Sequence, residues 1–383
     1  MSSNQFDVIV VGAGPAGACA AYDLARAGAR VLLLEKAKLP RHKTCGGGVT
    51  WKVAQSLAFD ITPVVERTIS TVVFSYKAGE SFELRSPDPL VYMVRRNAFD
   101  HLLAEQAVRV GATLLDECAV KSIDLSDASV TVCTAGDTFS ANWLIGADGA
   151  TGMVGKALGL MGNEQRVLMP AVESEIEVQP DIAEYWHDKM GLDLGYLPAS
   201  YGWVFPKADH LNVGVGGIAR GADYGQRLKS YDVAHTQGRV PRYERVRKSF
   251  GYVLPLRREG APIHKGSAML IGDAAGLVEA FTGEGIFWAV RSGQMAAQAI
   301  TSGQTSADYA HWVDQELMPD LISARRWSHI YMWAPRLCYS LPRHWLPMWN
   351  AVRKIVRGER GYSHIRKKLG VLGFMEGWLP AGI

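Results

Sequence analysis

The sequence predicts a mixed α/β fold in which a unit built on a parallel sheet is interleaved with an antiparallel sheet, and a helical segment ends the chain. Residues 6–35 have the pattern of a strand, a glycine-rich turn, a helix and a second strand, which form a βαβ unit. Residues 168–218 are rich in strand patterns broken by Pro and Gly, and the chain after residue 306 is helical and aromatic. A length of 383 residues accommodates two or three such units.

The expected elements follow in order along the chain. An apolar run over 7–11 predicts a buried strand, an Ala-rich stretch over 15–28 predicts a helix ending at a glycine, and 31–34 predicts the next strand. Residues 36–48 predict a loop, because Cys45 is followed by three glycines that do not suit a regular element. Further strands are expected over 69–94, 113–147 and 268–273, and further helices over 98–110 and from 283 to about 302. Breaks in the last helical segment are expected at Pro319, Pro335, Pro342 and Pro347.

Composition and charge exclude several classes of protein. Lys and Arg total 41 against 38 for Asp and Glu, and this bias is too weak to indicate a nucleic-acid partner. The five cysteines show no C-x-x-C spacing and none of the 10 histidines stands in an H-E-x-x-H pattern, so we expect neither a disulfide framework nor a metal site. A strand pattern begins by Phe6 and leaves no room for a signal peptide, which favours a reducing, cytoplasmic compartment.

The first glycine-rich turn has the spacing of a dinucleotide-binding fingerprint. Gly12, Gly14 and Gly17 follow the first strand and open a helix, and Glu35 ends the next strand. Such glycines let the backbone approach a pyrophosphate at the helix N-terminus, and the carboxylate accepts a hydrogen bond from a ribose. The sequence therefore predicts a Rossmann-like unit, and the fingerprint does not distinguish NAD from FAD.

A second string, Gly214-x-Gly216-x-x-Ala219, is not followed directly by a helix, and we interpret it as a glycine-rich strand end. Only one dinucleotide domain is then expected, so a nicotinamide cofactor would visit transiently. Asp148 and Asp273 each follow an apolar strand, where a carboxylate can reach a ligand at the carboxyl edge of a parallel sheet.

Four further stretches stand in a characteristic order: Pro40-Arg41-His42-Lys43-Thr44-Cys45-Gly46-Gly47-Gly48, Arg96-x-x-Phe99-Asp100, Pro198-x-x-Tyr201-x-Trp203-x-Phe205-Pro206-Lys207, and Gly272-Asp273-Ala274-Ala275-Gly276 with Phe281-Thr282-Gly283-Glu284-Gly285. Together with the fingerprint, they resemble the geranylgeranyl reductase family, within the flavoprotein monooxygenase-like superfamily. The resemblance spans residues 6 to about 303.

The resemblance implies a bound FAD, reduced by a transient donor such as NADPH or ferredoxin, that adds hydrogen to isolated double bonds of a prenyl chain. The positions implied to hold the cofactor are Gly12, Gly14, Gly17, Glu35, Arg41, Cys45, Gly46, Arg96, Asp148, Gly272, Asp273, Gly283 and Gly285. The last two glycines open a helix whose N–H groups would face the pyrimidine end of the flavin.

An aromatic run is the candidate substrate wall. Tyr201, Trp203 and Phe205 alternate along one predicted strand, so their rings share a face suited to an apolar chain. The same stripe is also typical of ordinary core. The resemblance implies that this run, with Pro206, lines the prenyl cavity.

Cys45, Tyr201 and His42 are the candidate catalytic residues, followed by Glu284. The resemblance places the Cys45 loop near the isoalloxazine ring, where the thiol would donate a proton or gate the ring. The alternative is that Cys45 is a small buried apolar residue.

We therefore expect an FAD-dependent reductase that hydrogenates isolated C=C bonds of a geranylgeranyl or related prenyl chain. The alternative is an FAD-dependent aromatic monooxygenase or halogenase, although no lysine motif of a halogenase is located. The prenyl group could belong to a lipid, a quinone, a chlorophyll precursor or a free diphosphate. The expected units are an FAD-binding domain over 1–165 and 255–305, a substrate-binding sheet domain over 166–254 joined by 65–95, and a helical segment over 306–383.

The end of the chain has a distinct charge and composition. Residues 321–383 hold 11 Lys or Arg against two acids, together with Trp327, Trp333, Trp345, Trp349 and Trp378. No uncharged run reaches 18 residues, so we expect no spanning helix but peripheral membrane contact through this segment. The alternative is a helical cap whose aromatic rings pack on the second sheet.

Overall fold

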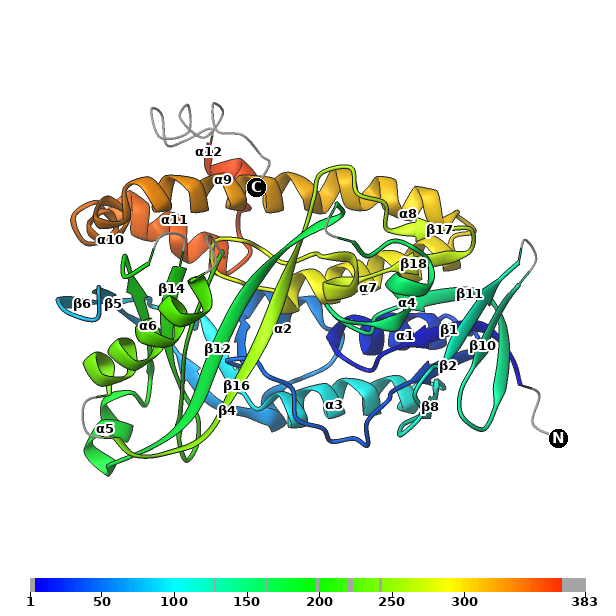
Figure 1. Cartoon of the computed structure of the whole chain (residues 1–383), viewed down its shortest axis with the longest axis horizontal. Coiled ribbons are helices and arrows are strands. Elements are labelled where there is room, and N and C mark those ends of the chain that lie inside the picture. The colour runs from blue at the N-terminus through cyan, green and yellow to red at the C-terminus, as the bar shows by residue number, and fades with distance from the viewer. Residues whose placement is uncertain are drawn as a thin grey trace.

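The computed structural model describes residues 4–126, 129–162, 164–197, 200–218, 223–240 and 243–366. Pro198, Ala219 and Trp378, named above as parts of motifs, lie outside these ranges, as do the basic residues Lys367 and Lys368. The described chain forms three sheets and a series of helices in one elongated body (Figure 1). The predicted mixed α/β fold is confirmed.

The first sheet has eight strands and carries the βαβ unit. Its order is β17 (His264–Lys265), β18 (Ala268–Leu270), β11 (Thr138–Gly146), β1 (Gln5–Val11), β2 (Val31–Leu34) and β8 (Thr113–Leu115), with β10 (Val130–Cys133) pairing with β11 and β9 (Ser122–Leu125) pairing with β10. The strands from β18 to β8 are parallel, so their carboxyl ends meet at one edge. The buried part of β1, from Val8 to Val11, and all of β2 are apolar without alternation, as expected of strands that are covered on both faces.

The second sheet has seven strands and forms the other half of the molecule. Its order is β16 (Tyr243–Arg257), β12 (Arg166–Val178), β15 (Leu211–Gly217), β14 (Ser200–Pro206), β13 (Lys189–Leu194), β5 (Thr71–Tyr76) and β6 (Ser81–Arg85). The sheet was predicted to be antiparallel, but β13 and β5 pair in parallel. The reason is that β5 and β6 come from a distant part of the chain and add to the edge as a separate hairpin.

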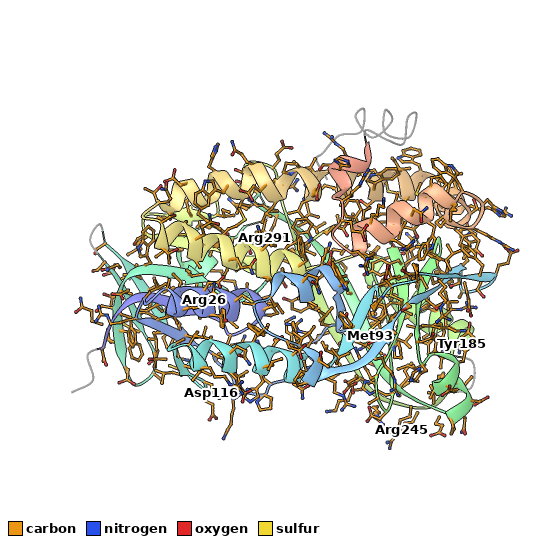
Figure 2. The ribbon with its side chains drawn as sticks, turned by 180° about the vertical axis from the view of Figure 1, so that it is seen from behind. Arg26, Met93, Asp116, Tyr185, Arg245 and Arg291 are labelled. Carbon is orange, nitrogen blue, oxygen red and sulfur yellow. The ribbon has the colours of Figure 1, made fainter. Side chains whose placement is uncertain are left out.

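A small third sheet joins the two halves. It consists of β3 (Gly48–Thr50), β7 (Val91–Val94) and β4 (Val65–Ile69). Gly48, predicted to belong to the loop, is the first residue of β3 because it pairs with Met93. Figure 2 shows Met93 between the half that carries Arg26 and the half that carries Tyr185.

Three long helices cover the first sheet: α1 (Pro15–Arg26), α3 (Arg96–Arg109) and α7 (Ile286–Thr301). Figure 2 shows α7, which carries Arg291, lying along α1, and the added Cβ of a residue at Gly293 would meet the Ala16 carbonyl oxygen. Shorter elements are α2 (Trp51–Ser56), the 3₁₀ turn η1 (Thr62–Val64), α4 (Met153–Ala157), α5 (Pro180–Tyr185) and the 3₁₀ turn η2 (Gly272–Ala275).

Helix α6 (Tyr224–Arg239) was not predicted, because residues 166–254 were assigned to a sheet domain. Its sequence is mostly polar, and only a few side chains, among them Tyr224, Leu228 and Tyr231, are buried against the second sheet. The glycines of the second G-x-G string lie inside β15. A Cβ at Gly214 would lie 2.3 Å from the Trp203 ring, so this glycine makes room for an indole.

The C-terminal segment is helical, as predicted, with α8 (Ser306–Trp312), the π-helical turn η3 (Val313–Leu317), α9 (Met318–Trp333), α10 (Pro335–His344), α11 (Leu346–Val356) and α12 (Tyr362–Arg366). Pro335 and Pro347 lie in the first turns of α10 and α11, where a proline interrupts no hydrogen bond. The break expected at Pro319 is wrong, because the chain stays helical from α8 through the π-helical turn η3 into α9. The break expected at Pro342 is wrong. Pro342 lies in the last turn of α10, where its missing N–H costs the helix a single hydrogen bond.

Candidate functional site

The glycine-rich turn between β1 and α1 opens at the carboxyl edge of the first sheet. Gly12 has a φ of +107°, and a Cβ there would lie 2.4 Å from the carbonyl oxygen of Ala147. At Gly17 a Cβ would lie 1.9 Å from the Gly12 carbonyl oxygen. At Gly14 the nearest atom is the Arg41 guanidinium, 3.7 Å away, so that side of the turn is open.

Glu35, at the end of β2, lies directly beside this turn. Its carboxylate accepts hydrogen bonds from the N–H groups of Ala13 and Ala37, both at 3.1 Å, and pairs with Arg41 Nε at 3.2 Å. Because each carboxylate oxygen has two lone pairs, acceptor capacity remains for a hydroxyl group.

A buried carboxylate orients two arginines at the same edge. Asp100 on α3 is fully buried and accepts two hydrogen bonds from Arg96, at 2.8 and 3.0 Å, and one from Arg41 at 3.0 Å. Although burial opposes it, the negative charge of Asp100 and the Cys45 sulfur raise the pKa of Arg96. Asp100 was quoted in a motif but not predicted as a site residue, and its role in placing both guanidinium groups is visible only in the structure.

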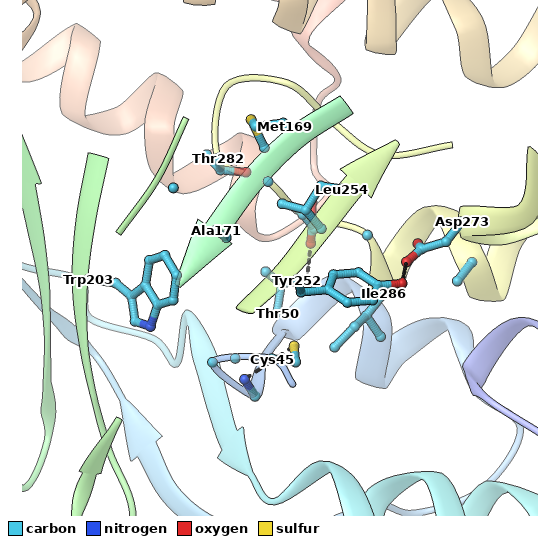
Figure 3. Close-up of a pocket in the computed structure, with 18 of the residues that line it drawn as sticks. Cys45, Thr50, Met169, Ala171, Trp203, Tyr252, Leu254, Asp273, Thr282 and Ile286 are labelled. Carbon is cyan, nitrogen blue, oxygen red and sulfur yellow. Dashed lines mark hydrogen bonds between the residues drawn. The ribbon is translucent and has the colours of Figure 1, made fainter. Parts of the chain in front are cut away.

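The two aspartates that follow apolar strands reach the same edge. Asp148 accepts hydrogen bonds from the N–H groups of Met153 and Val154 through Oδ2, whereas its buried Oδ1 has no partner among the described residues. Burial raises the pKa of Asp148. Asp273 accepts a hydrogen bond from the Tyr252 hydroxyl at 2.9 Å (Figure 3).

A connected cavity of about 810 Å³ extends from this edge to the second sheet and the C-terminal helices. The predicted site residues that line it are Gly12, Gly14, Glu35, Arg41, His42, Cys45, Gly46, Arg96, Asp148, Tyr201, Trp203, Phe205, Asp273, Gly283 and Gly285. Gly17, Gly272 and Pro206 are not among the lining residues. Gly17 and Gly272 instead allow close packing against Gly12 and Ala16, and Pro206 is buried at the end of β14.

The Cys45 loop crosses the middle of the cavity and is held from the second sheet. The Cys45 N–H donates to Glu173 on β12 at 2.9 Å, and the Gly47 N–H donates to Cys45 Sγ at 3.4 Å. Lys207 Nζ, which is buried, donates to the carbonyl oxygens of Gly46 at 2.8 Å, Val94 at 2.9 Å and Gly47 at 3.3 Å. Burial lowers the pKa of Lys207 to about 8 and raises the pKa of Glu173.

The aromatic side chains of β14 form one wall of the cavity beside this loop. The ring centroids of Tyr201 and Trp203 are 5.8 Å apart, and those of Trp203 and Phe205 are 6.3 Å apart. A Cβ at Gly46 would lie 2.8 Å from the Phe205 ring, so the loop approaches the wall closely. Figure 3 shows Trp203 and Cys45 bordering one space, with Tyr252 and Asp273 farther along it.

The other candidate proton donors are held by different partners. The Tyr201 hydroxyl donates to the Thr282 carbonyl oxygen, and burial raises its pKa. His42 stacks on Phe250 with ring centroids 4.1 Å apart, and burial lowers its pKa. Glu284 pairs with Lys52 Nζ at 2.5 Å and accepts a hydrogen bond from Thr50 at 2.7 Å.

Lys43 is a lining residue that sequence reasoning missed, although it stands in a quoted stretch. Its ammonium lies 3.2 Å from the ring centroid of Tyr252, and burial, with a contribution from Arg96, lowers its pKa to about 8. Tyr252 itself carries no sequence signal, because it stands in a long strand without a motif.

The roof of the cavity comes from the C-terminal helices, which the sequence did not connect with the site. Its apolar lining residues there include Trp327, Leu337, Leu341, Met348, Trp349 and Val352. Trp349 is buried, stacks edge-on against Phe74 and donates to the Arg85 carbonyl oxygen at 3.3 Å. This part of the segment is a cap on the second sheet.

The residues present fit an FAD molecule. The turn at Gly14 leaves open space at the sheet edge for a pyrophosphate. At the same edge, Asp148 Oδ1 is an acceptor without a partner among the described residues, and the two arginines bound to Asp100 provide positive charge. Among the described residues no helix has the length and apolar character needed to cross a membrane, and no three His, Cys, Asp or Glu side chains form a metal-binding group.

The comparisons with known sequences agree with this geometry. The family model described as "FAD binding domain" matches residues 5–209. An uncharacterized protein of Methanosarcina barkeri is 35% identical over 305 residues, which cover 79% of this chain and 76% of that protein. The chloroplastic geranylgeranyl diphosphate reductase of Nicotiana tabacum is 31% identical over 329 residues, 79% of this chain and 68% of that protein. The menaquinone reductase of Mycolicibacterium smegmatis is 31% identical over 329 residues, 81% and 80% respectively.

Solved structures show the same fold. A geranylgeranyl bacteriochlorophyll reductase-like protein from Thermoplasma acidophilum has a TM-score of 0.73 at 24% identity, covering 84% of this chain and 86% of its own. The flavin-dependent brominase Bmp2 also has a TM-score of 0.73, at 20% identity, covering 92% and 94%. At these identities the structures establish the fold alone. The family follows from the sequence relatives reported above, whose named members at 31% identity are reductases. The chain binds FAD through a domain of the FAD binding family and, within that fold, belongs to the geranylgeranyl reductase family.

Proposed function

We propose that this chain is an FAD-dependent reductase that hydrogenates isolated C=C bonds of a geranylgeranyl or related prenyl chain. The observation that carries the proposal is the single cavity in which the nucleotide edge, the Cys45 loop and an apolar chamber are continuous. The chamber is bounded by the β14 aromatic wall and the C-terminal helices, and such an apolar surface suits a long prenyl chain. The named activities of the relatives share a prenylated molecule.

When bound, FAD would supply the electrons as hydride, and it would be held by the Gly12–Gly17 turn, Glu35, Asp148, Asp273 and the first turn of α7. NADPH or ferredoxin is the proposed donor that reduces it. The remaining work falls to the protein: it excludes water, orients the alkene along the aromatic wall, and delivers a proton to one alkene carbon.

We propose Cys45 as the residue that holds this proton. Its sulfur lies in the cavity, and the Gly47 N–H and the Arg96 guanidinium would stabilise the thiolate left after proton transfer. Tyr201 is less suited because its hydroxyl proton is engaged by the Thr282 carbonyl oxygen. His42 is less suited because its lowered pKa leaves the imidazole neutral near pH 7.

The test is anaerobic. The holoenzyme reduced with dithionite is incubated with a geranylgeranyl lipid, and mass spectrometry follows the product. A reductase gives a gain of two hydrogens per turnover without oxygen, whereas a monooxygenase or halogenase gives no product until oxygen is admitted. Product that appears only with oxygen would overturn the proposal.

We also propose that the protein meets its substrate as a peripheral membrane protein through residues 321–383. The relatives reported above include a menaquinone reductase, and molecules with the long apolar chain of menaquinone partition into lipid.

A further inference from the structure

The C-terminal helices carry positive charge without neighbouring acids in the sequence. Residues 321–358 contain seven Lys or Arg and no Asp or Glu. Charge of one sign over such a length attracts an anionic surface. The structure shows where on this segment the charges meet exposed apolar groups.

Helix α10 has two different faces. Tyr339 and Pro342 are buried beneath it, and the Tyr339 hydroxyl donates to the Glu80 carbonyl oxygen at 3.1 Å in the β5–β6 hairpin. Arg336, Leu337, Arg343 and His344 are exposed, and their spacing of i, i+1, i+7 and i+8 places them on one side of the helix.

Exposed apolar side chains flank this outer face. Trp333, at the end of α9, is 80% exposed, Leu346, at the start of α11, is 67% exposed, and Leu337 is 44% exposed. Large apolar residues so exposed and so close along the chain are unusual on a protein that stays in water. Figure 1 shows α10 at one end of the molecule, beside the β5–β6 hairpin. We name the group formed by Trp333, Arg336, Leu337, Arg343 and Leu346 the α10 face.

The lining of the cavity extends to this face. Leu337 is both exposed and a lining residue of the cavity, and Cys338, Leu341, Pro342 and Met348 continue the lining inward. An apolar path therefore leads from the outer side of α10 to the β14 aromatic wall.

We infer that the α10 face docks on an anionic lipid bilayer and holds the cavity mouth against it, so that a prenyl chain enters from the lipid without crossing water. This inference rests on the proposed function for the identity of the chain that enters. It commits to a lipid surface because aromatic and aliphatic side chains together with arginines suit the headgroup region, where rings are amphipathic anchors and cations meet anionic lipid.

The first experiment measures binding alone. FAD-loaded protein is co-sedimented with vesicles of phosphatidylcholine, with and without phosphatidylglycerol. We expect binding to the anionic vesicles, weakened by salt, and a loss of about tenfold or more in Arg336→Gln/Arg343→Gln and in Trp333→Ser/Leu337→Ser/Leu346→Ser. Matched controls remove exposed groups elsewhere, Arg109→Gln on α3 and Val233→Ser on α6, and should bind as the wild type does.

Two results would overturn the inference. One is binding that the α10-face variants leave unchanged. The other is a concentration-dependent dimer in sedimentation velocity that the apolar triple variant abolishes, which would make the face an interface between two copies of the chain.

A second experiment separates failure of the docking from failure of the proposed function. The double variant Trp333→Ser/Leu346→Ser, which leaves the cavity lining unchanged, should lose reduction of a geranylgeranyl lipid embedded in vesicles and keep reduction of a short, detergent-dispersed prenyl alcohol. Equal activity of variant and wild type on the embedded lipid would overturn the docking. Absence of reduction by the wild type on either substrate would overturn the proposed function, while the sedimentation result would still decide the docking.

Discussion

The position of Cys45 is fixed by hydrogen bonds that its neighbours in the sequence did not predict. Its N–H is bound by Glu173, and its sulfur accepts the Gly47 N–H, so the loop is shaped by backbone contacts that Cys45→Ala leaves intact apart from the one to sulfur. We expect this variant to retain FAD and to lose alkene reduction by at least about tenfold, a conservative threshold because a general acid typically contributes about 10²–10⁴-fold. Product formation under anaerobic conditions and flavin absorbance measure the two quantities.

The matched control is Cys133→Ala, a cysteine on β10 outside the cavity, which should leave turnover unchanged. Full activity in Cys45→Ala would instead show that this thiol is a packing residue.

Lys207 on the second-sheet side holds the same loop through hydrogen bonds to its carbonyl oxygens. Lys207→Met would leave the buried carbonyl oxygens of Gly46 and Val94 without this donor, while the Gly47 oxygen keeps the Val94 N–H at 2.9 Å. Each unsatisfied group costs about 1–3 kcal/mol, so the free energy of unfolding should fall by at least about 2 kcal/mol. Urea denaturation checks this, and Lys189→Met, on the surface of the same sheet, should cost less than about 1 kcal/mol. Equal losses in the two variants would contradict the assignment.

Lys207 also predicts a pH dependence. Its pKa is about 8 in the folded protein, below the ordinary value of 10.5, because burial disfavours the charged ammonium. Below pH 8 the ammonium is charged in both the folded and the unfolded chain, so the folded state bears the full cost of burying that charge. This cost falls as pH rises from about 8 towards 10.5, because the folded state releases its proton first. The stability of the wild type relative to Lys207→Met should therefore increase between pH 7 and about 9.5. A difference that stays constant with pH would contradict the shifted pKa.

At the scale of elements, two glycines of the βαβ turn have different roles: Gly14 faces open space for a ligand, and Gly17 packs against the backbone of Gly12. At Gly14 a side chain meets only the Arg41 guanidinium at 3.7 Å, whereas at Gly17 it would overlap the Gly12 carbonyl oxygen. Gly14→Val should therefore fold with a melting temperature near that of the wild type but lose bound FAD, because its side chain would occupy the pyrophosphate position.

Gly17→Val, in contrast, should lower the melting temperature itself. Thermal unfolding and the flavin absorbance of the purified variants distinguish the two. Normal flavin content in Gly14→Val would show that the cofactor does not lie against this turn.

The same scale explains which elements the sequence could predict. The strands and helix of residues 5–34 follow from local apolar periodicity, and they fold where the pattern indicates. Helix α6 was not predicted because its sequence is mostly polar. Only a few of its side chains contact the second sheet, whose strands come from other parts of the chain. The parallel pairing of β13 with β5 joins residues more than a hundred positions apart, and no local pattern encodes such a register.

At the scale of the whole molecule, the cavity size depends on how the C-terminal helices sit over the second sheet. Leu192 on β13 lines the chamber opposite these helices, so Leu192→Trp should shorten it without touching the nucleotide edge. We expect normal FAD content and a larger fall in kcat/KM for a geranylgeranyl substrate than for a shorter geranyl one. Steady-state rates with the two substrates provide the measurement.

The control for this variant is Leu168→Trp, an exposed position on β12 outside the cavity lining. Equal losses with long and short substrates in Leu192→Trp would mean that the chain does not occupy this chamber.

The sequence motifs located the nucleotide edge and the aromatic wall, but the roof could not be predicted. Trp349 and Leu341 carry no motif, and only the tertiary packing brings them to β5 and β13.

The strand order of the first sheet has a consequence for how the protein is made. β1 lies between β2 and β11, and β18 joins from residues 268–270, so the nucleotide edge is assembled from segments synthesised far apart in time. Near the end of the described chain, the Tyr362 hydroxyl donates to Glu279, which binds the N–H groups ahead of α7. A nascent chain on the ribosome thus displays the glycine turn early but lacks Asp273 and the α7 end until late in translation. We therefore expect flavin binding to be a late event in biogenesis, and a chain released early would expose an incomplete, apolar sheet to chaperones or proteases.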